Sequence, residues 1–79
     1  MEKAMKLTQS DILVVRDGYT TEILDILPRE IFGEVSIGDT VLITTPGEDG
    51  PIIMGKNIVD KQLIIDHTIN EIMFNIFVG

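Results

Sequence analysis

The sequence of 79 residues contains no cysteine, and this absence removes several classes of small protein. A chain of this size buries only about 60–65% of the surface that its unfolded state exposes, so many domains of this length depend on disulfides or structural metals. Without cysteine the chain forms no disulfide and no thiolate zinc site. We interpret residues 1–79 as a single domain stabilised by one hydrophobic core, with residues 1–7 flexible.

Long hydrophobic runs are also missing. No segment approaches the roughly 20 apolar residues that a membrane helix needs, and the stretch MEKAMKLTQSD at the start has no apolar region long enough for a signal peptide. We therefore expect a soluble, cytoplasmic protein with no membrane partner and no cofactor.

Basic residues are few. Lysine and arginine together number 6, against 13 aspartates and glutamates, for a formal net charge of −7. Nucleic-acid affinity comes largely from basic side chains that displace counterions from phosphates. The cations are scattered along the chain, so we do not expect nucleic acid as a partner.

Isoleucine and valine are abundant, and short turn signals such as Asp17-Gly18 and Gly38-Asp39 recur along the chain. β-Branched residues favour strands, and turns at short intervals are typical of several short antiparallel strands. The sequence therefore predicts a mainly β fold, a small antiparallel barrel of the SH3-like or OB-like type.

Individual elements follow from the same signals. Residues 12–15 and 19–27 predict a hairpin, in which Gly18 supplies the positive φ of the turn. A short helical turn is expected near residues 28–33, with Pro28 first and Gly33 closing it. A second hairpin joins residues 35–44 to residues 52–55, ending or bulging at Gly55, and further strands are expected at residues 62–66 and 71–79.

The C-terminal segment allows two readings. Residues 71–79, EIMFNIFVG, alternate as a strand does, but Thr68 and Glu71 have the spacing of a helix capping box. We prefer the strand, and the alternative is an α+β fold with a helix from about residue 68. The expected core consists of Ile12, Val14, Ile23, Ile26, Val41, Ile43, Ile53 and Ile65.

Few residues suggest chemistry. Gly50 with Gly55-Lys56 approximates a phosphate-binding loop, but position 57 is Asn and the intervening residues predict a strand. His67 beside Asp66 is interpreted as a solvated turn. Glu48 and Asp49 are weak candidates for a metal site, because calcium loops need carboxylates at alternating positions. We name no catalytic residue and expect no enzymatic activity.

Some segments resemble parts of known barrel families. The run DGYTTEILDILPREIFGEVSIGDTVLI looks like the strand, turn and strand of several small barrels, among them the hydrogenase-maturation chaperones. The run GDTVLITTPGEDGPIIMGK is similar in outline to OB-domain segments of phage baseplate proteins. LPREIF before VSIGDTVLI resembles swapped-hairpin transcription factors. The cysteine near the start of the chaperones and the basic residues of the transcription factors are absent here.

The apolar content favours an assembly role. Hydrophobic residues make up 44% of the chain, and several strands have apolar residues on both faces. We expect a non-enzymatic protein-binding module, a structural subunit of a homo- or hetero-oligomer; the alternative is a transcriptional regulator or nucleic-acid-binding barrel. The uncharged C-terminal segment is the expected interface, through Ile72, Phe74, Ile76, Phe77 and Val78.

Overall fold

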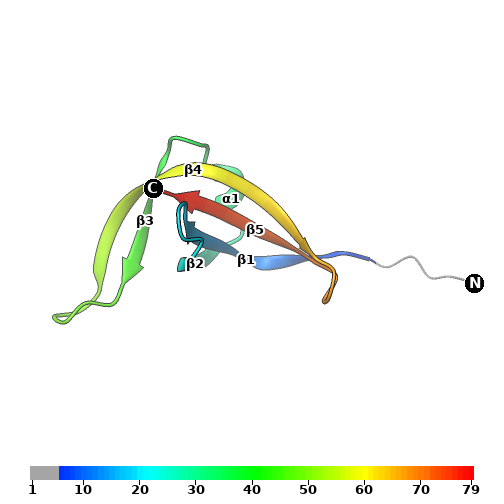
Figure 1. Ribbon diagram of the computed structural model, residues 1–79, viewed down its shortest axis with the longest axis horizontal. Coiled ribbons are helices and arrows are strands. Elements are labelled where there is room, and N and C mark those ends of the chain that lie inside the picture. Colours follow the sequence, from blue (N-terminus) through cyan, green and yellow to red (C-terminus); the bar gives the residue numbers. More distant parts are fainter. Residues whose placement is uncertain (1–5) are drawn as a thin grey trace, which may run out of the picture.

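The computed structural model describes residues 6–79 and confirms a mainly β fold, a small barrel with one short helix (Figure 1). The expected flexibility of residues 1–7 falls mostly on residues 1–5, which lie outside the described range. The elements in chain order are β1 (Thr8–Asp17), β2 (Ile23–Pro28), α1 (Ile31–Glu34), β3 (Thr40–Thr45), β4 (Ile52–Asp66) and β5 (Glu71–Val78).

The five strands form one sheet in the order β2-β1-β5-β4-β3. The hairpin pairs β1–β2, β3–β4 and β4–β5 are antiparallel, whereas β1 and β5 run parallel. The two edge strands, β2 and β3, come back into contact, so the sheet is nearly closed into a barrel. Both predicted hairpins are present.

Strand β4 differs from its prediction, because residues 52–55 and 62–66 belong to one strand of 15 residues. Gly55 does not end it: Gly55 pairs with Leu42, and pairing continues past the polar residues that follow. The register shifts between Ile58 and Asp60, and such a bulge bends a strand. Consequently β4 curves across the molecule and joins the β3 hairpin to the rest of the sheet (Figure 1).

The C-terminal segment is a strand, so the alternative with a helix from about residue 68 is wrong. Strand β5 lies in the middle of the sheet and pairs with β1 on one side and β4 on the other. Ladder bonds to both neighbours occupy the backbone groups that a helix would use internally, and tertiary pairing thus overrides the capping-box signal.

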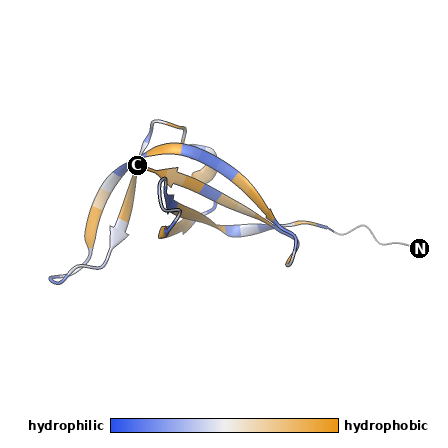
Figure 2. Cartoon of the chain, in the orientation of Figure 1, coloured by the Kyte–Doolittle hydropathy of each residue, from blue (hydrophilic) through white to orange (hydrophobic). Residues whose placement is uncertain are grey.

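The core is built from the strand faces that point into the barrel. The buried hydrophobic residues are Leu13, Val14, Val15, Val41, Ile43, Ile58, Ile76 and Val78. The expected core was right for Val14, Val41 and Ile43 and wrong for Ile12, Ile23, Ile26, Ile53 and Ile65, which are exposed. Because successive strand residues point to opposite faces, a shift of one residue moves a whole apolar set outward. Figure 2 shows hydrophobic residues distributed along every strand.

Helix α1 covers part of the core. It begins at Ile31, whereas the prediction placed the helical turn at residues 28–33, because Pro28 is still the last residue of β2. The Phe32 ring meets the Phe74 ring edge-on at 5.2 Å, and the Lys61 Nζ lies 4.5 Å from the centre of the Phe32 ring. Lys61 also donates a hydrogen bond of 2.7 Å to the backbone carbonyl of Val35. These contacts attach the segment around α1 to β4 and β5.

The turn between β1 and β2 is stabilised by Asp17. Its Oδ1 accepts hydrogen bonds from the backbone N–H of Tyr19 (2.7 Å) and of Thr20 (2.9 Å). The positive φ of this turn belongs to Thr21, with φ of 61°, and not to Gly18 as predicted. The Asp17 carboxylate accepts hydrogen bonds in the way that a backbone carbonyl does in an ordinary turn, and this arrangement is an Asx turn.

Candidate protein interaction surfaces

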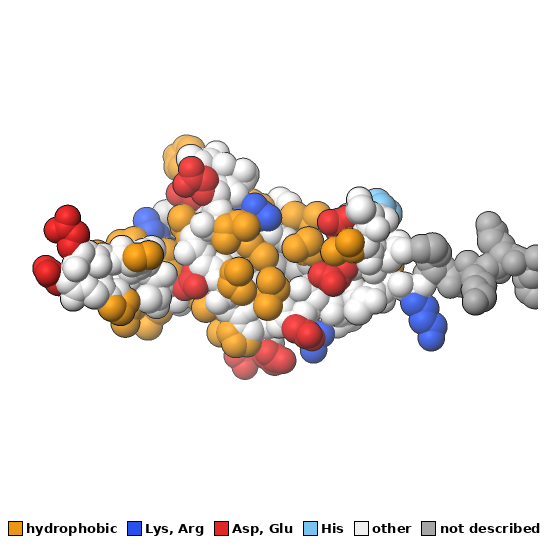
Figure 3. Space-filling model, turned by 90° about the horizontal axis from the view of Figure 1, so that it is seen from below, with side chains coloured by type: hydrophobic (Ala, Val, Ile, Leu, Met, Phe, Trp, Pro, Cys, Tyr) orange, Lys and Arg blue, Asp and Glu red, His pale blue; other side chains and the backbone are white. Residues whose placement is uncertain are grey.

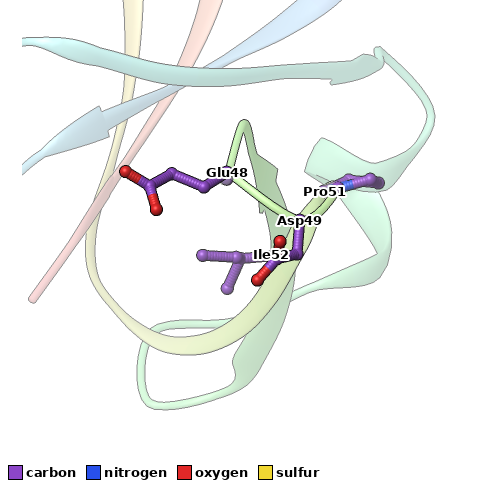
Figure 4. Close-up of a pocket in the computed structure, with 6 residues that line it drawn as sticks. Glu48, Asp49, Pro51 and Ile52 are labelled. Atoms are coloured by element: carbon purple, nitrogen blue, oxygen red, sulfur yellow. The ribbon is translucent and has the colours of Figure 1, made fainter.

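The acidic turn between β3 and β4 contains the two weak metal candidates. Figure 4 shows that the Glu48 and Asp49 side chains point in different directions from the turn. The turn encloses an open hollow of about 440 Å³ lined by residues 47–52. Within residues 6–79 no three aspartate, glutamate or histidine side chains come together as metal ligands would. Both carboxylates are exposed.

The histidine turn between β4 and β5 is ordered by its aspartate. Asp66 Oδ1 accepts a hydrogen bond of 2.9 Å from the backbone N–H of Thr68, and His67 is exposed. The Asp66 carboxylate therefore stabilises the backbone of the turn.

The predicted C-terminal interface needs correction, because β5 is the central strand. Ile76 and Val78 are fully buried in the core and cannot form a surface contact. Phe74 packs against the core and against Phe32, while Ile72 and Phe77 are half-buried. The uncharged composition that suggested an exposed strand is explained by pairing on both sides within the chain.

An exposed apolar surface lies on the hairpin of β3 and the first half of β4, which we call the arm (residues 40–57). The tip of the arm, which is the turn between β3 and β4, projects away from β1, β2 and α1 (Figure 1), whereas β3 itself contacts β2. Its exposed hydrophobic side chains are Leu42 (65% exposed), Ile52, Ile53 (66% exposed) and Met54.

These side chains occupy both faces of the arm. Met54 pairs with the buried Ile43, so Met54 and Ile52 belong to the inner face. Leu42 and Ile53 alternate with them and belong to the outer face. The backbone edge of β3 that faces away from β4 has no strand partner in the described sheet.

A second apolar surface lies on the outer face of β1 and β2. Because Leu13 and Val15 point into the core, Ile12 and Arg16, which alternate with them along β1, point outward; Val14 lies on the same outer face but is buried, at 3% exposed. Ile26 of β2 pairs with Val14, and Ile23 pairs with Arg16. We define the receiving face as the exposed side chains of Ile12, Ile23 and Ile26 together with Arg16.

Arg16 is held in place by neutral partners. Its Nε donates a hydrogen bond of 2.8 Å to Oδ1 of the buried Asn75, and its Nη1 donates one of 3.0 Å to the carbonyl of Thr21. A planar guanidinium fixed in this way is preorganised to bind a carboxylate. Its anchor, Asn75, was not singled out from the sequence. An asparagine within the otherwise apolar run of residues 72–78 was the available signal.

Other exposed hydrophobic side chains, Leu63, Ile64, Ile65 and Ile69, lie at the opposite end of the β4–β5 hairpin from the arm. Apolar residues on both faces of VLI and IIM were visible in the sequence, but only the structure distinguishes exposed members from buried ones.

Comparison with known proteins found no matching protein family, no similar curated protein and no similar solved structure. Within residues 6–79 there is no helix with the length and apolar character needed to span a membrane.

Proposed function

We propose that this protein is a non-enzymatic assembly subunit, and that its partner is a second copy of the same chain. The observation that carries the proposal is the projecting arm with large apolar side chains exposed on both faces. Soluble monomers rarely expose contiguous apolar patches of more than a few hundred Å², and larger patches mark interaction sites.

Burial of the arm would supply a substantial driving force. Full burial of a leucine, isoleucine or methionine side chain contributes about 1.5–3 kcal/mol, so the arm's four exposed side chains together could contribute several kcal/mol. The chain itself covers only Val41 and Ile43 on the inner face of the arm, so another molecule is needed to cover the side chains that stay exposed on both faces.

We further propose a cytoplasmic location and a barrel of the SH3-like type. Strands adjacent in the sequence are neighbours around the barrel, and this meander order lacks the Greek-key crossing of the OB fold. Helix α1 lies between β2 and β3.

Light scattering coupled to size-exclusion chromatography tests the assembly role over a range of protein concentrations. The wild type is expected to have a mass of two or more chains, and replacement of Leu42 and Ile53 by threonine is expected to give a folded monomer. Threonine keeps the strand preference while it removes apolar area. Replacement of Ile69, an exposed residue outside the arm, by threonine is the matched control and should leave the mass of the assembly unchanged.

A monomeric wild type at high concentration would overturn the proposal. DNA or RNA binding that weakens steeply as salt rises would instead support the nucleic-acid-binding alternative.

A further inference from the structure

We infer that the copies assemble head to tail, with the arm of one copy docked on the receiving face of the next. This inference rests on the proposed function and adds the identity of the two contacting surfaces. Each surface is apolar with a charged group beside it, and the charges of the two surfaces are opposite.

The receiving face offers a fixed cation within an apolar surface. Ile23 and Ile26 are each more than half exposed, and across the β1–β2 pair Ile23 lies opposite Arg16 and Ile26 opposite Val14. The hydrogen bonds of Arg16 end on Asn75 and on the Thr21 carbonyl, both neutral, so its charge is not neutralised by them. Figure 3, which views the molecule from the side of β1 and β2, shows hydrophobic side chains gathered over its middle.

The arm offers the complementary arrangement. Glu48 and Asp49 are exposed at its tip, and the exposed Ile52 and Ile53 follow directly where β4 begins. Carboxylates and apolar side chains are thus presented together, in the combination that matches Arg16 beside Ile23 and Ile26. Arginine is also one of the residue types enriched among the energetic centres of protein interfaces.

Electrostatics distinguishes this contact from symmetric ones. An isologous contact between two arms near their tips would bring four carboxylates together, and one between two receiving faces would bring two Arg16 side chains together. Like charges facing each other across an interface disfavour the complex. With a net charge of −7, copies of this chain repel one another unless local opposite charges meet.

A head-to-tail contact leaves one arm and one receiving face unused in every dimer. Such heterologous contacts continue into closed rings or open filaments, whereas a two-fold contact stops at the dimer. The structure therefore predicts assemblies of more than two chains.

Complementation between two blocked variants tests the inference. The arm-blocked variant carries Glu48→Lys and Asp49→Lys, and the face-blocked variant carries Ile26→Glu, at a position that is 53% exposed. Ile23→Glu is a second face-blocked variant, for use if the first does not fold. Circular dichroism checks each fold, and Glu34→Lys, an exposed charge reversal on α1, is the matched control.

Each blocked variant alone is expected to be a monomer under conditions in which the wild type and Glu34→Lys assemble. An equimolar mixture is expected to give a species of two chains and nothing larger, because one intact arm meets one intact face. The mixture should form this species at a concentration at least about tenfold below that at which either variant alone self-associates.

The outcomes separate the two proposals. A wild type that remains monomeric overturns the assembly role itself. A wild type that assembles, with blocked variants that assemble equally well or a mixture that stays monomeric, overturns only the head-to-tail contact.

Discussion

The carboxylate of Asp25 on β2 accepts a hydrogen bond of 2.9 Å from the backbone N–H of Thr44 on β3. These two strands are the edges of the sheet and share no ladder pairing. The same carboxylate, through Oδ1, accepts the backbone N–H of its neighbour Ile26 at 2.7 Å. A side chain thus bridges the seam at which the barrel nearly closes.

Replacement of Asp25 by alanine is expected to loosen this seam. One hydrogen bond of this kind contributes about 0.5–1.5 kcal/mol to stability, and its loss frees the Thr44 amide. Amide hydrogen exchange measured by NMR should show faster exchange at Thr44 in the variant. Asp25→Asn retains an acceptor oxygen and should exchange more slowly than the alanine variant. Unchanged exchange at Thr44 in Asp25→Ala would contradict the bridging role.

Asp17 makes the stability depend on pH. Hydrogen bonds from the backbone N–H of Thr20 and then of Tyr19 stabilise its ionised form and lower its pKa below the ordinary aspartate value. A lowered folded pKa contributes stability that is present above the unfolded pKa of about 3.9 and is lost as pH falls through the folded pKa.

NMR titration checks this expectation directly. The Asp17 carboxyl in the folded protein should titrate at lower pH than in an unstructured peptide with the same turn sequence. The stability difference between the wild type and Asp17→Ser should shrink on acidification over the same range. Equal pKa values in protein and peptide would rule out the effect.

Ile76 and Ile53 provide a matched comparison of the inner and outer faces. Ile76 is fully buried, so Ile76→Val should lower the free energy of unfolding by about 0.5–1.5 kcal/mol. Ile53 is mostly exposed, and Ile53→Val should change the stability of the isolated subunit by less than about 0.5 kcal/mol. Urea denaturation at low protein concentration measures both. A larger cost at Ile53 would place that residue in the core, as the sequence had suggested.

We expect the charges of the acidic turn to contribute little to the stability of the subunit. Replacement of Glu48 and Asp49 together by serine should change the free energy of unfolding by no more than about 0.5 kcal/mol, because both side chains are exposed. Thermal unfolding at low concentration, with and without added calcium, measures this directly. A large drop in melting temperature, or a rise in wild-type melting temperature with calcium, would indicate a bound cation at the turn.

Local signals in the sequence determined most of the strands and turns, but not the continuity of β4. β-Branched residues and turn dipeptides were sufficient to locate both hairpins, and alternation in residues 71–79 correctly favoured a strand. These features depend on residues close together in the chain. The same composition also showed that several strands are apolar on both faces, as the arm is.

Tertiary structure decided which apolar face is buried and which strand is central. Ile12 and Leu13 are equally apolar neighbours, yet only Leu13 points into the barrel. Only the pairing of β5 with both β1 and β4 places Ile76 and Val78 in the core and leaves the arm exposed. Strand faces alternate every residue, so where both faces are apolar the pattern alone does not specify the inward one, and contacts between distant segments select it.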